Sequence, residues 1–449
     1  MSRLAAFVLM VLASCTPMPK TPETARAVPL DVSLAPIKTF AAKPVRTPTR
    51  SNAEIAQDFI DLTFRLESGR EIPFMTRFEG PISVGVTGDV SDILVADLDQ
   101  LLSRLRTEAS IDITRTSSQT PDIIVEAIPR DVLSKTVPRA ACFVVPRIAS
   151  WDEFLQKRGT NALDWTTLRN RNRATMFVPA DVAPQEIRDC LHEELAQALG
   201  PLNDLYRLPD SVFNDDNIHN VLTSFDMLIL KTYYAADLRN GMSRTEVAAR
   251  LPALLNRLNP AGRNSPMRGA DLTNRNWITS VQTALSSDVS PTRRRAAAQQ
   301  AVTLSDAMGW SGPRTAFALY AQGRLLVGHD SDAALRAFQR ADRIYRENPA
   351  TAIHAAHIAV QRAAFTYAAG DTQATIEIAD EAIPSARSHQ NAALLATLMM
   401  FKAEALALQG DDAAAAAVHL DSLGWARYGF GQDIVVQARL NEIRALRPL

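Results

Sequence analysis

The spacing of apolar residues along the chain changes from helical to strand-like and back within the first two hundred residues. Residues 53–66 carry apolar side chains three and four positions apart, which predicts an amphipathic helix. Residues 82–87 alternate between apolar and polar or small side chains, as a half-buried strand does. By the same criteria we expect a helix over 92–107 and further strands over 74–78, 111–114, 122–128, 141–145 and 173–178.

A third helix is predicted after the last of these strands. Pro184 suits the first turn of a helix, and Gly200 followed by Pro201 suits its end. The order is therefore a strand, a helix, more strands and then this central helix. It predicts a domain of class α+β over residues 53–242, with one helix under the sheet and the central helix beside it.

Residues 243–449 read as almost entirely helical. Ser243 and Glu246 form a capping-box pattern, and 259–271 is a loop rich in Gly, Pro and Asn. Turns at Gly370-Asp371 and Gly410-Asp411 each precede an Ala-rich helix, so the repeat length is about 40 residues against 34 for a strict tetratricopeptide repeat. We therefore predict an all-α, tetratricopeptide-like array of helical hairpins that binds a protein or cell-wall partner.

The N-terminus has the layout of an export signal. Arg3 precedes an apolar run that ends in Leu-Ala-Ser before Cys15, which resembles a bacterial lipoprotein signal over residues 1–15. The resemblance implies a lipid anchor at Cys15 in the cell envelope, facing the periplasm. Because Thr16 follows, we expect the outer rather than the inner membrane. A plain secretory signal is the alternative. Residues 16–52 are rich in Pro and are expected to form a tether.

The net charge bears on the class of partner, and the cysteine content bears on possible disulfide bonds. The chain has 449 residues, a formal net charge of −1 and a pI near 6.7, so no overall basic field points to nucleic acid as a partner. With Cys15 lipidated, Cys142 and Cys190 remain as a pair in an oxidising compartment. They are expected either to form a disulfide between a strand and the central helix or to be two separate buried thiols.

The central helix carries the candidate chemistry. Glu193, Gln197 and Gly200 fall at i, i+4 and i+7, the frame in which metallopeptidases place two His ligands and a turning Gly. In that frame Glu193, Gln197 and Asn203 are candidate metal ligands, with Asp204 as an alternative to Asn203, and Glu194 is the candidate general base. Oxygen ligands suit Ca²⁺, Mg²⁺ or Mn²⁺ better than Zn²⁺, and His219 could add a nitrogen. The other interpretation is that these side chains only fix the turn after the helix.

These residues also carry a family resemblance. The frame Glu193 to Asp204, together with later motifs, resembles the bacterial domain-of-unknown-function family 2927. The later motifs are Phe213-Asn214-Asp215, Leu222-Thr223-x-x-Asp226 and Leu238-x-x-Gly241-Met242. The resemblance implies a zincin- or metzincin-like fold with a degenerate motif, and it carries no biochemical function.

Three functions follow as hypotheses. The first is a cell-envelope lipoprotein with a non-catalytic or weakly active metallopeptidase-like domain and a helical binding array. The second is an active metal-dependent peptidase that uses Glu194 as its base. The third is a scaffolding factor for envelope assembly. No cofactor is expected beyond a weakly bound divalent metal.

Overall fold

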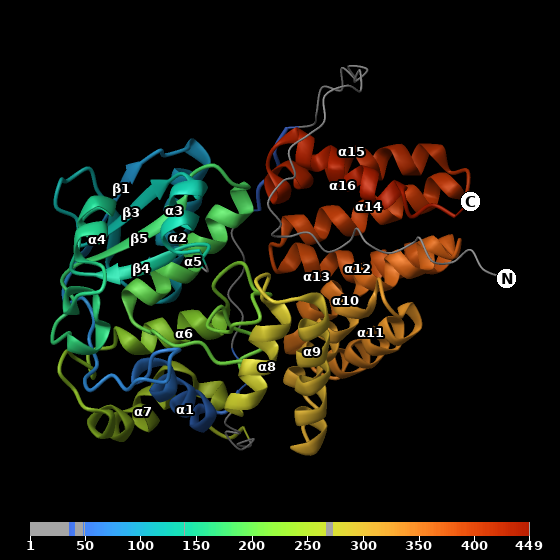
Figure 1. The fold of residues 1–449 in the computed structure, drawn as a ribbon. Helices are drawn as coiled ribbons and strands as arrows, with labels where there is room; N and C mark the ends of the chain where they lie inside the picture. Colours follow the sequence, from blue (N-terminus) through green and yellow to red (C-terminus); the bar gives the residue numbers. More distant parts are fainter. Residues whose placement is uncertain (1–35, 41–47, 49, 139, 266–272, 449) are drawn as a thin grey trace. The chain divides into compact units, whose positions relative to one another are not determined.

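The computed structural model describes residues 36–40, 48, 50–138, 140–265 and 273–448 (Figure 1). Cys15 and most of the predicted tether 16–52 lie outside these residues. The chain divides into two compact units, which are described separately below. We call residues 41–272 the α/β unit, and residues 1–40 together with 273–449 the helical unit.

A five-stranded mixed sheet forms the centre of the α/β unit, in the order β2-β1-β3-β5-β4 (Figure 1). Only β4 runs antiparallel to its neighbour β5, and the other three pairs are parallel. The central strands β3 and β5 are apolar runs that are buried on both faces, as expected of parallel strands covered on either side. The strands are β1 (Ile82–Gly88), β2 (Ile113–Arg115), β3 (Ile123–Ile128), β4 (Phe143–Pro146) and β5 (Ala174–Pro179).

Seven α-helices accompany the sheet among the described residues of this unit: α1 (Asn52–Thr63), α2 (Asp92–Glu108), α3 (Arg130–Thr136), α4 (Trp151–Lys157), α5 (Pro184–Leu199), α6 (Ser224–Tyr233) and α7 (Arg244–Leu258). Helices α2 and α5 pack against each other, and α5 also packs on β4 and β5. The main core joins sheet and helices through buried side chains such as Leu98, Val125 and Leu195. A smaller aromatic cluster of Phe143, Trp151, Phe154 and Phe177 packs under the antiparallel edge.

Most of the elements predicted for this unit are present, with three differences. Residues 74–78 form no strand, and α3 and α4 were not predicted. The helix expected over 53–66 ends at Thr63, because the chain from Phe64 to Ile72 folds back on itself, with the N–H of Ile72 donating to the carbonyl of Phe64 at 2.9 Å. The boundary between the units falls after residue 272, so α7 lies with the α/β unit, whereas the sequence analysis begins the second domain at residue 243.

The described part of the helical unit beyond residue 272 is all-helical. Consecutive helices pack as pairs, α8 with α9, α10 with α11, α12 with α13 and α14 with α15. Asp330, Asp371 and Asp411 each cap the second helix of a pair by accepting a backbone N–H three residues on. These caps are 41 and 40 residues apart, which agrees with the predicted repeat length. The helices are α8 (Arg275–Leu285), α9 (Pro291–Ala307), α10 (Pro313–Leu326), α11 (Ser331–Arg346), α12 (Ala352–Ala368), α13 (Thr372–Ser388), α14 (Ala392–Leu408), α15 (Asp412–Phe430) and α16 (Asp433–Arg444).

Residues 36–40 form a short strap that packs on α15 within the helical unit. The backbone N–H of Lys38 donates to the carbonyl of Gly424 at 3.1 Å, and the Lys38 ammonium pairs with Asp421. The ring of Phe40 stacks on Trp425 with centroids 4.6 Å apart. A Cβ at Gly424 would come within 2.8 Å of the Lys38 side chain, so the glycine makes room for the strap. This part of the expected tether is therefore bound to the fold.

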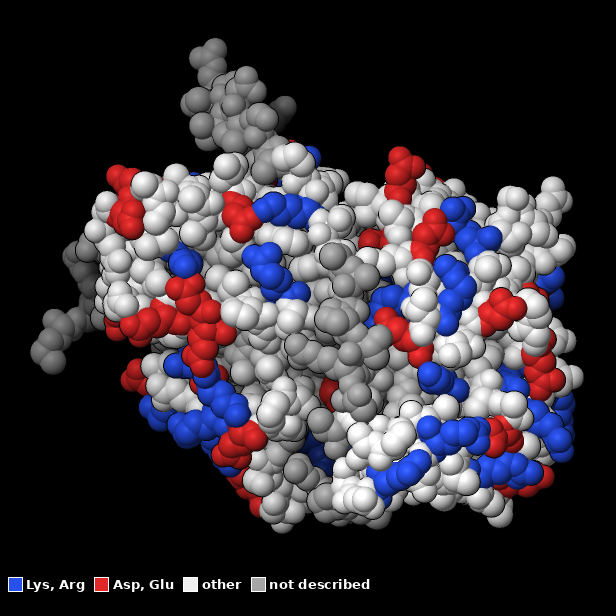
Figure 2. Space-filling view, turned by 180° about the vertical axis from the view of Figure 1, so that it is seen from behind, with Lys and Arg blue, Asp and Glu red and all other residues white. Residues whose placement is uncertain are grey.

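Surface charge on the described residues is mixed. Figure 2 shows Lys and Arg interspersed with Asp and Glu over the face that it draws. Among the described helices, none has the length and apolar composition that crossing a bilayer requires.

Candidate functional site

Helix α5 carries the predicted motif, and its ends are fixed by its neighbours. Its backbone closes at Gly200, whose N–H donates to the carbonyl of Ala196 at 3.1 Å. A Cβ on Gly200 would lie 2.9 Å from the Tyr233 ring on α6. The glycine therefore lets the chain pack closely against α6. A side chain at this position of the predicted turn would clash with the Tyr233 ring.

A buried arginine caps the C-terminus of α5. Arg171 is 2% exposed, and its Nη1 donates to the carbonyl oxygens of Gln197 at 2.7 Å and Ala198 at 2.6 Å. Its Nη2 reaches the carbonyl of Gly200 at 3.1 Å. A positive charge at this end of a helix satisfies carbonyls that have no intrahelical partner and opposes the helix dipole. Sequence reasoning missed this residue, because only the fold brings position 171 to the end of the helix.

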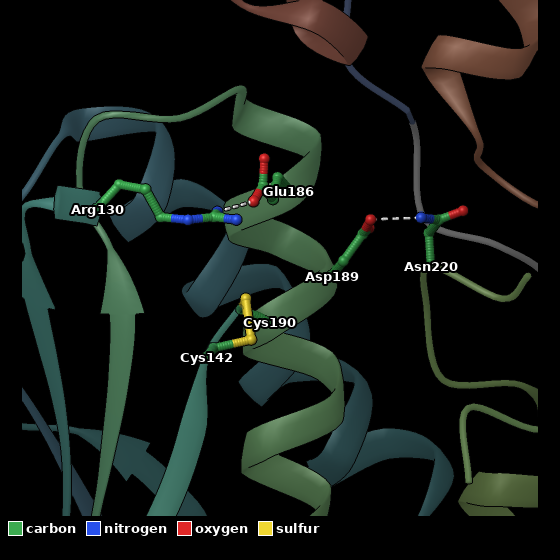
Figure 3. The surroundings of a disulfide bond; sticks show 6 residues. All are labelled: Arg130, Cys142, Glu186, Asp189, Cys190 and Asn220. Atoms are coloured by element: carbon green, nitrogen blue, oxygen red, sulfur yellow. Dashed lines mark hydrogen bonds and ion pairs between the residues drawn. A yellow bond between two sulfur atoms is a disulfide. The ribbon is translucent and has the colours of Figure 1, made fainter. Parts of the chain in front are cut away.

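A disulfide joins Cys142, directly before β4, to Cys190 in α5 (Figure 3). Their Cα atoms are 5.9 Å apart. The disulfide interpretation is thereby confirmed over that of two separate thiols. Figure 3 also shows Asp189 on the same helix, hydrogen-bonded to Asn220. The covalent bond and this hydrogen bond attach α5 to the sheet edge and to the segment that precedes α6.

The predicted metal ligands have different surroundings. Glu193 and Gln197 are half-buried side chains on α5. Asn203 is 7% exposed, and its Nδ2 donates to the backbone carbonyl of Asp61 on α1 at 2.9 Å. Its amide thus holds the turn after α5 against α1, which is the structural role weighed for it in the sequence analysis. Glu194, the predicted base, is 4% exposed.

The structure brings three other carboxylates together beside this helix. Glu67, Asp204 and Asp215 each offer an oxygen, and the three oxygens lie within 4.8 Å of one another. We call these three residues the acidic triad. Glu67 is exposed in the turn after α1, and Asp204 follows α5 directly. Asp204 was an alternative ligand in the sequence analysis, whereas Glu67 was missed because it lies more than a hundred residues from the motif.

The carboxylates around the triad repel one another. Burial, with Glu67 and Asp215 nearby, raises the pKa of Glu193 to about 7. Burial, with Glu67 and Asp216 nearby, raises the pKa of Asp215 to about 6. Burial and acidic neighbours also raise the pKa values of Glu194 and Asp204 well above their usual range. This part of the fold concentrates negative charge that water does not fully solvate.

Neither histidine of the described α/β unit serves such a site. His192 is 4% exposed, and its Nδ1 accepts the backbone N–H of Leu222 at 3.0 Å. His219 bonds through Nε2 to the carbonyl of Pro209 at 2.9 Å. The two rings hold the segment between α5 and α6. His219, considered as an additional ligand in the sequence analysis, is engaged in backbone contacts.

Asp226 organises the segment between α5 and α6. It is fully buried at the start of α6 and accepts the backbone N–H of Thr223 at 2.7 Å in a capping box. It also accepts the Ser211 hydroxyl at 2.5 Å and the Val212 N–H at 3.2 Å. These bonds fix the chain on both sides of Asp215 and so help to position the acidic triad.

Comparison with known proteins gives one family and no relatives of known activity. Residues 52–253 match the model of a family described as "Protein of unknown function (DUF2927)". The match supports the family assignment of this region. No curated protein and no solved structure matches the chain.

Proposed function

We propose, from the match of residues 52–253 to DUF2927 and from the geometry of α5, that the α/β unit is a metallopeptidase-like domain used for binding rather than catalysis. We propose further that the chain is a cell-envelope lipoprotein anchored at Cys15, and that the helical unit binds a protein or cell-wall partner.

One observation carries the proposal. Helix α5 follows β5 and ends at the tightly packed Gly200, as the metallopeptidase frame expects, but the ligand positions hold Glu193, Gln197 and Asn203. The amide of Asn203 is hydrogen-bonded to α1. Both histidines of the described α/β unit are bonded elsewhere. A zinc ion of the usual peptidase type would lack its nitrogen ligands.

The protonation of Glu194 supports the same conclusion. A general base must be ionised near neutral pH to accept a proton. Burial and the charges of Glu193 and Glu67 raise the pKa of Glu194 well above its usual range. A raised pKa disfavours the ionised form of Glu194, which is the form that a general base requires.

The test compares peptide hydrolysis by the full-length protein in detergent with that of Glu194→Gln, each with and without added Zn²⁺. We expect equal, background-level rates for both proteins. Hydrolysis that Glu194→Gln abolishes in a folded protein would contradict the proposal and support the active-peptidase alternative. Glu186→Gln, on the same helix, serves as the control because Glu186 pairs with Arg130 away from the triad (Figure 3).

A second experiment tests whether the scaffold is metallopeptidase-like. The triple variant Glu193→His, Gln197→His and Asn203→His introduces the three-histidine pattern on α5 and in the turn that follows it. We expect it to bind one Zn²⁺ per chain, with wild type binding none. A folded triple variant that binds no Zn²⁺ would show that the three positions do not converge, and the metallopeptidase-like interpretation would be wrong.

A further inference from the structure

The acidic triad has electrostatics unlike those of the buried acids Asp58 and Asp61 on α1. Asp58 and Asp61 on α1 are 4% and 6% exposed, and Arg207 donates to both, at 2.8 and 2.9 Å. Arg50 donates to Asp58 as well. Buried charges in proteins are normally paired in this way.

The carboxylates at the triad have acidic neighbours instead. The charged groups that shift the pKa values of Asp204, Asp215, Glu193 and Glu194 are Glu67, Glu193, Asp215 and Asp216. Every one of these neighbours is an acid. The charge of this region is therefore balanced by protons or by a cation from solution.

Two buried carboxylate oxygens at this place have no hydrogen-bond partner. Oδ1 of Asp204 and Oε2 of Glu194 are both inaccessible to solvent and unpaired. Glu194 as a residue is 4% exposed, and burial, Glu193 and Glu67 of the triad raise its pKa. An unsatisfied buried oxygen is costly, and a bound ion is one of its ordinary explanations.

We propose that Glu67, Asp204 and Asp215 bind one Ca²⁺ ion. Three carboxylates from separate chain segments, with no His or Cys among them, form a hard oxygen site. Ca²⁺ fits better than Mg²⁺ because it tolerates irregular geometry and bidentate carboxylates. The ion would join the turn after α1 to the end of α5 and to the segment before α6.

This site does not depend on the proposed loss of catalysis, since its ligands differ from the predicted set Glu193, Gln197 and Asn203. The test is calorimetric titration of the chelator-treated full-length protein with CaCl₂, and in parallel with MgCl₂ and ZnCl₂. Thermal unfolding is measured with and without each salt. We expect one Ca²⁺ per chain, a Kd between about 1 µM and 1 mM, and a rise in Tm of at least about 3 °C at saturation.

Two single variants identify the ligands. We expect Glu67→Gln and Asp215→Asn each to weaken Ca²⁺ binding at least tenfold, as the loss of a charged ligand should. Glu67 is exposed, so Glu67→Gln is expected to fold even where a buried substitution does not. The matched control is Glu71→Gln, because Glu71 is an exposed acid four residues away with 78% of its side chain accessible. Its Ca²⁺ affinity should equal that of wild type.

Three results would overturn the proposal. The first is a folded wild-type protein that takes up no Ca²⁺. The second is Ca²⁺ binding that is unchanged in both Glu67→Gln and Asp215→Asn. The third is a preference for Zn²⁺ that is lost in Glu193→Ala with Gln197→Ala but kept in the triad variants. That third result would assign the metal to the frame on α5, and the peptide hydrolysis assay with Glu194→Gln would still be interpretable.

Discussion

The guanidinium of Arg171 and the carbonyl of Gly200 are hydrogen-bonded at 3.1 Å, at the point where α5 ends and the chain turns toward Asp204. Arg171 also bonds to two carbonyls in the last turn of the helix. Removing it would take this donor from the carbonyls of Ala198 and Gly200, whereas the carbonyl of Gln197 would keep the Gly200 N–H. We expect Arg171→Ala to lower the free energy of unfolding by about 3 kcal/mol, measured by urea denaturation.

The control for that measurement is Arg169→Ala. Arg169 is exposed and stacks over Phe74, so its loss should cost less than about 1 kcal/mol. If the two variants lowered the free energy of unfolding equally, the cap on α5 would make no specific contribution to stability.

The disulfide should be a large contributor to the stability of the α/β unit. Cys142 and Cys190 are 48 positions apart, and in the chain-entropy model a loop of this length is worth about 4 kcal/mol. We expect the double variant Cys142→Ala, Cys190→Ala to have a free energy of unfolding lower by that amount, as measured by urea denaturation. Cys15→Ser should leave the same transition unchanged. A loss below about 1 kcal/mol in the double variant would contradict the estimate.

The turn at Gly200 should tolerate no side chain. A Cβ there would meet the Tyr233 ring at 2.9 Å, a contact that forces α6 or the ring to move. We expect Gly200→Ala to lower the free energy of unfolding by about 1 to 3 kcal/mol, measured by thermal or urea unfolding. Combination with Tyr233→Leu, which removes the ring, should cost less than the sum of the two single variants. Simple additivity would show that the two positions do not clash.

Stability in the presence of chelator should fall as the pH rises. The fold raises the pKa of Glu193 from 4.5 to about 7 and that of Asp215 from 3.8 to about 6. Between pH 4 and pH 7 the native state therefore binds more protons than the unfolded state, so deprotonation favours unfolding. We expect a loss of about 3 kcal/mol between pH 5 and pH 8, measured by urea denaturation at a series of pH values.

Glu193→Gln should flatten that pH dependence, because it removes one of the carboxyl groups whose pKa the fold raises. Added Ca²⁺ should stabilise the protein more at pH 8 than at pH 5, since at low pH protons compete for the same oxygens. A stability that rises with pH in chelator would contradict both the assigned pKa shifts and their cause.

The sequence predicted those features that depend on local patterns. Five of the predicted strands, the central helix and the turns before α13 and α15 lie near their predicted positions. Helices α3 and α4 are seven residues each, too short to show a helical period clearly. Residues 74–78 have strand-like composition, but they pair with no strand of the sheet.

The site was harder to predict, for a physical reason. Along α5 the helical period identifies neighbours, so Glu193 and Gln197 could be placed on one face. Beyond Gly200 the chain is no longer helical, and the period does not distinguish Asn203 from Asp204. The structure turns Asn203 to α1 and leaves Asp204 with the triad. Glu67 and Arg171 reach the site only through tertiary packing, so no local pattern could have indicated them.

If the proposed lipid anchor at Cys15 is present, the strap at residues 36–40 shortens the segment that joins the anchor to the fold. If Cys15 is the anchor, 21 positions separate it from Pro36, whereas 37 would separate it from the first helix at Asn52. Fully extended, the shorter segment spans roughly 75 Å. With that anchor, the helical unit would be joined to the lipid by the shorter segment, and Pro36 would lie within that distance of the lipid surface.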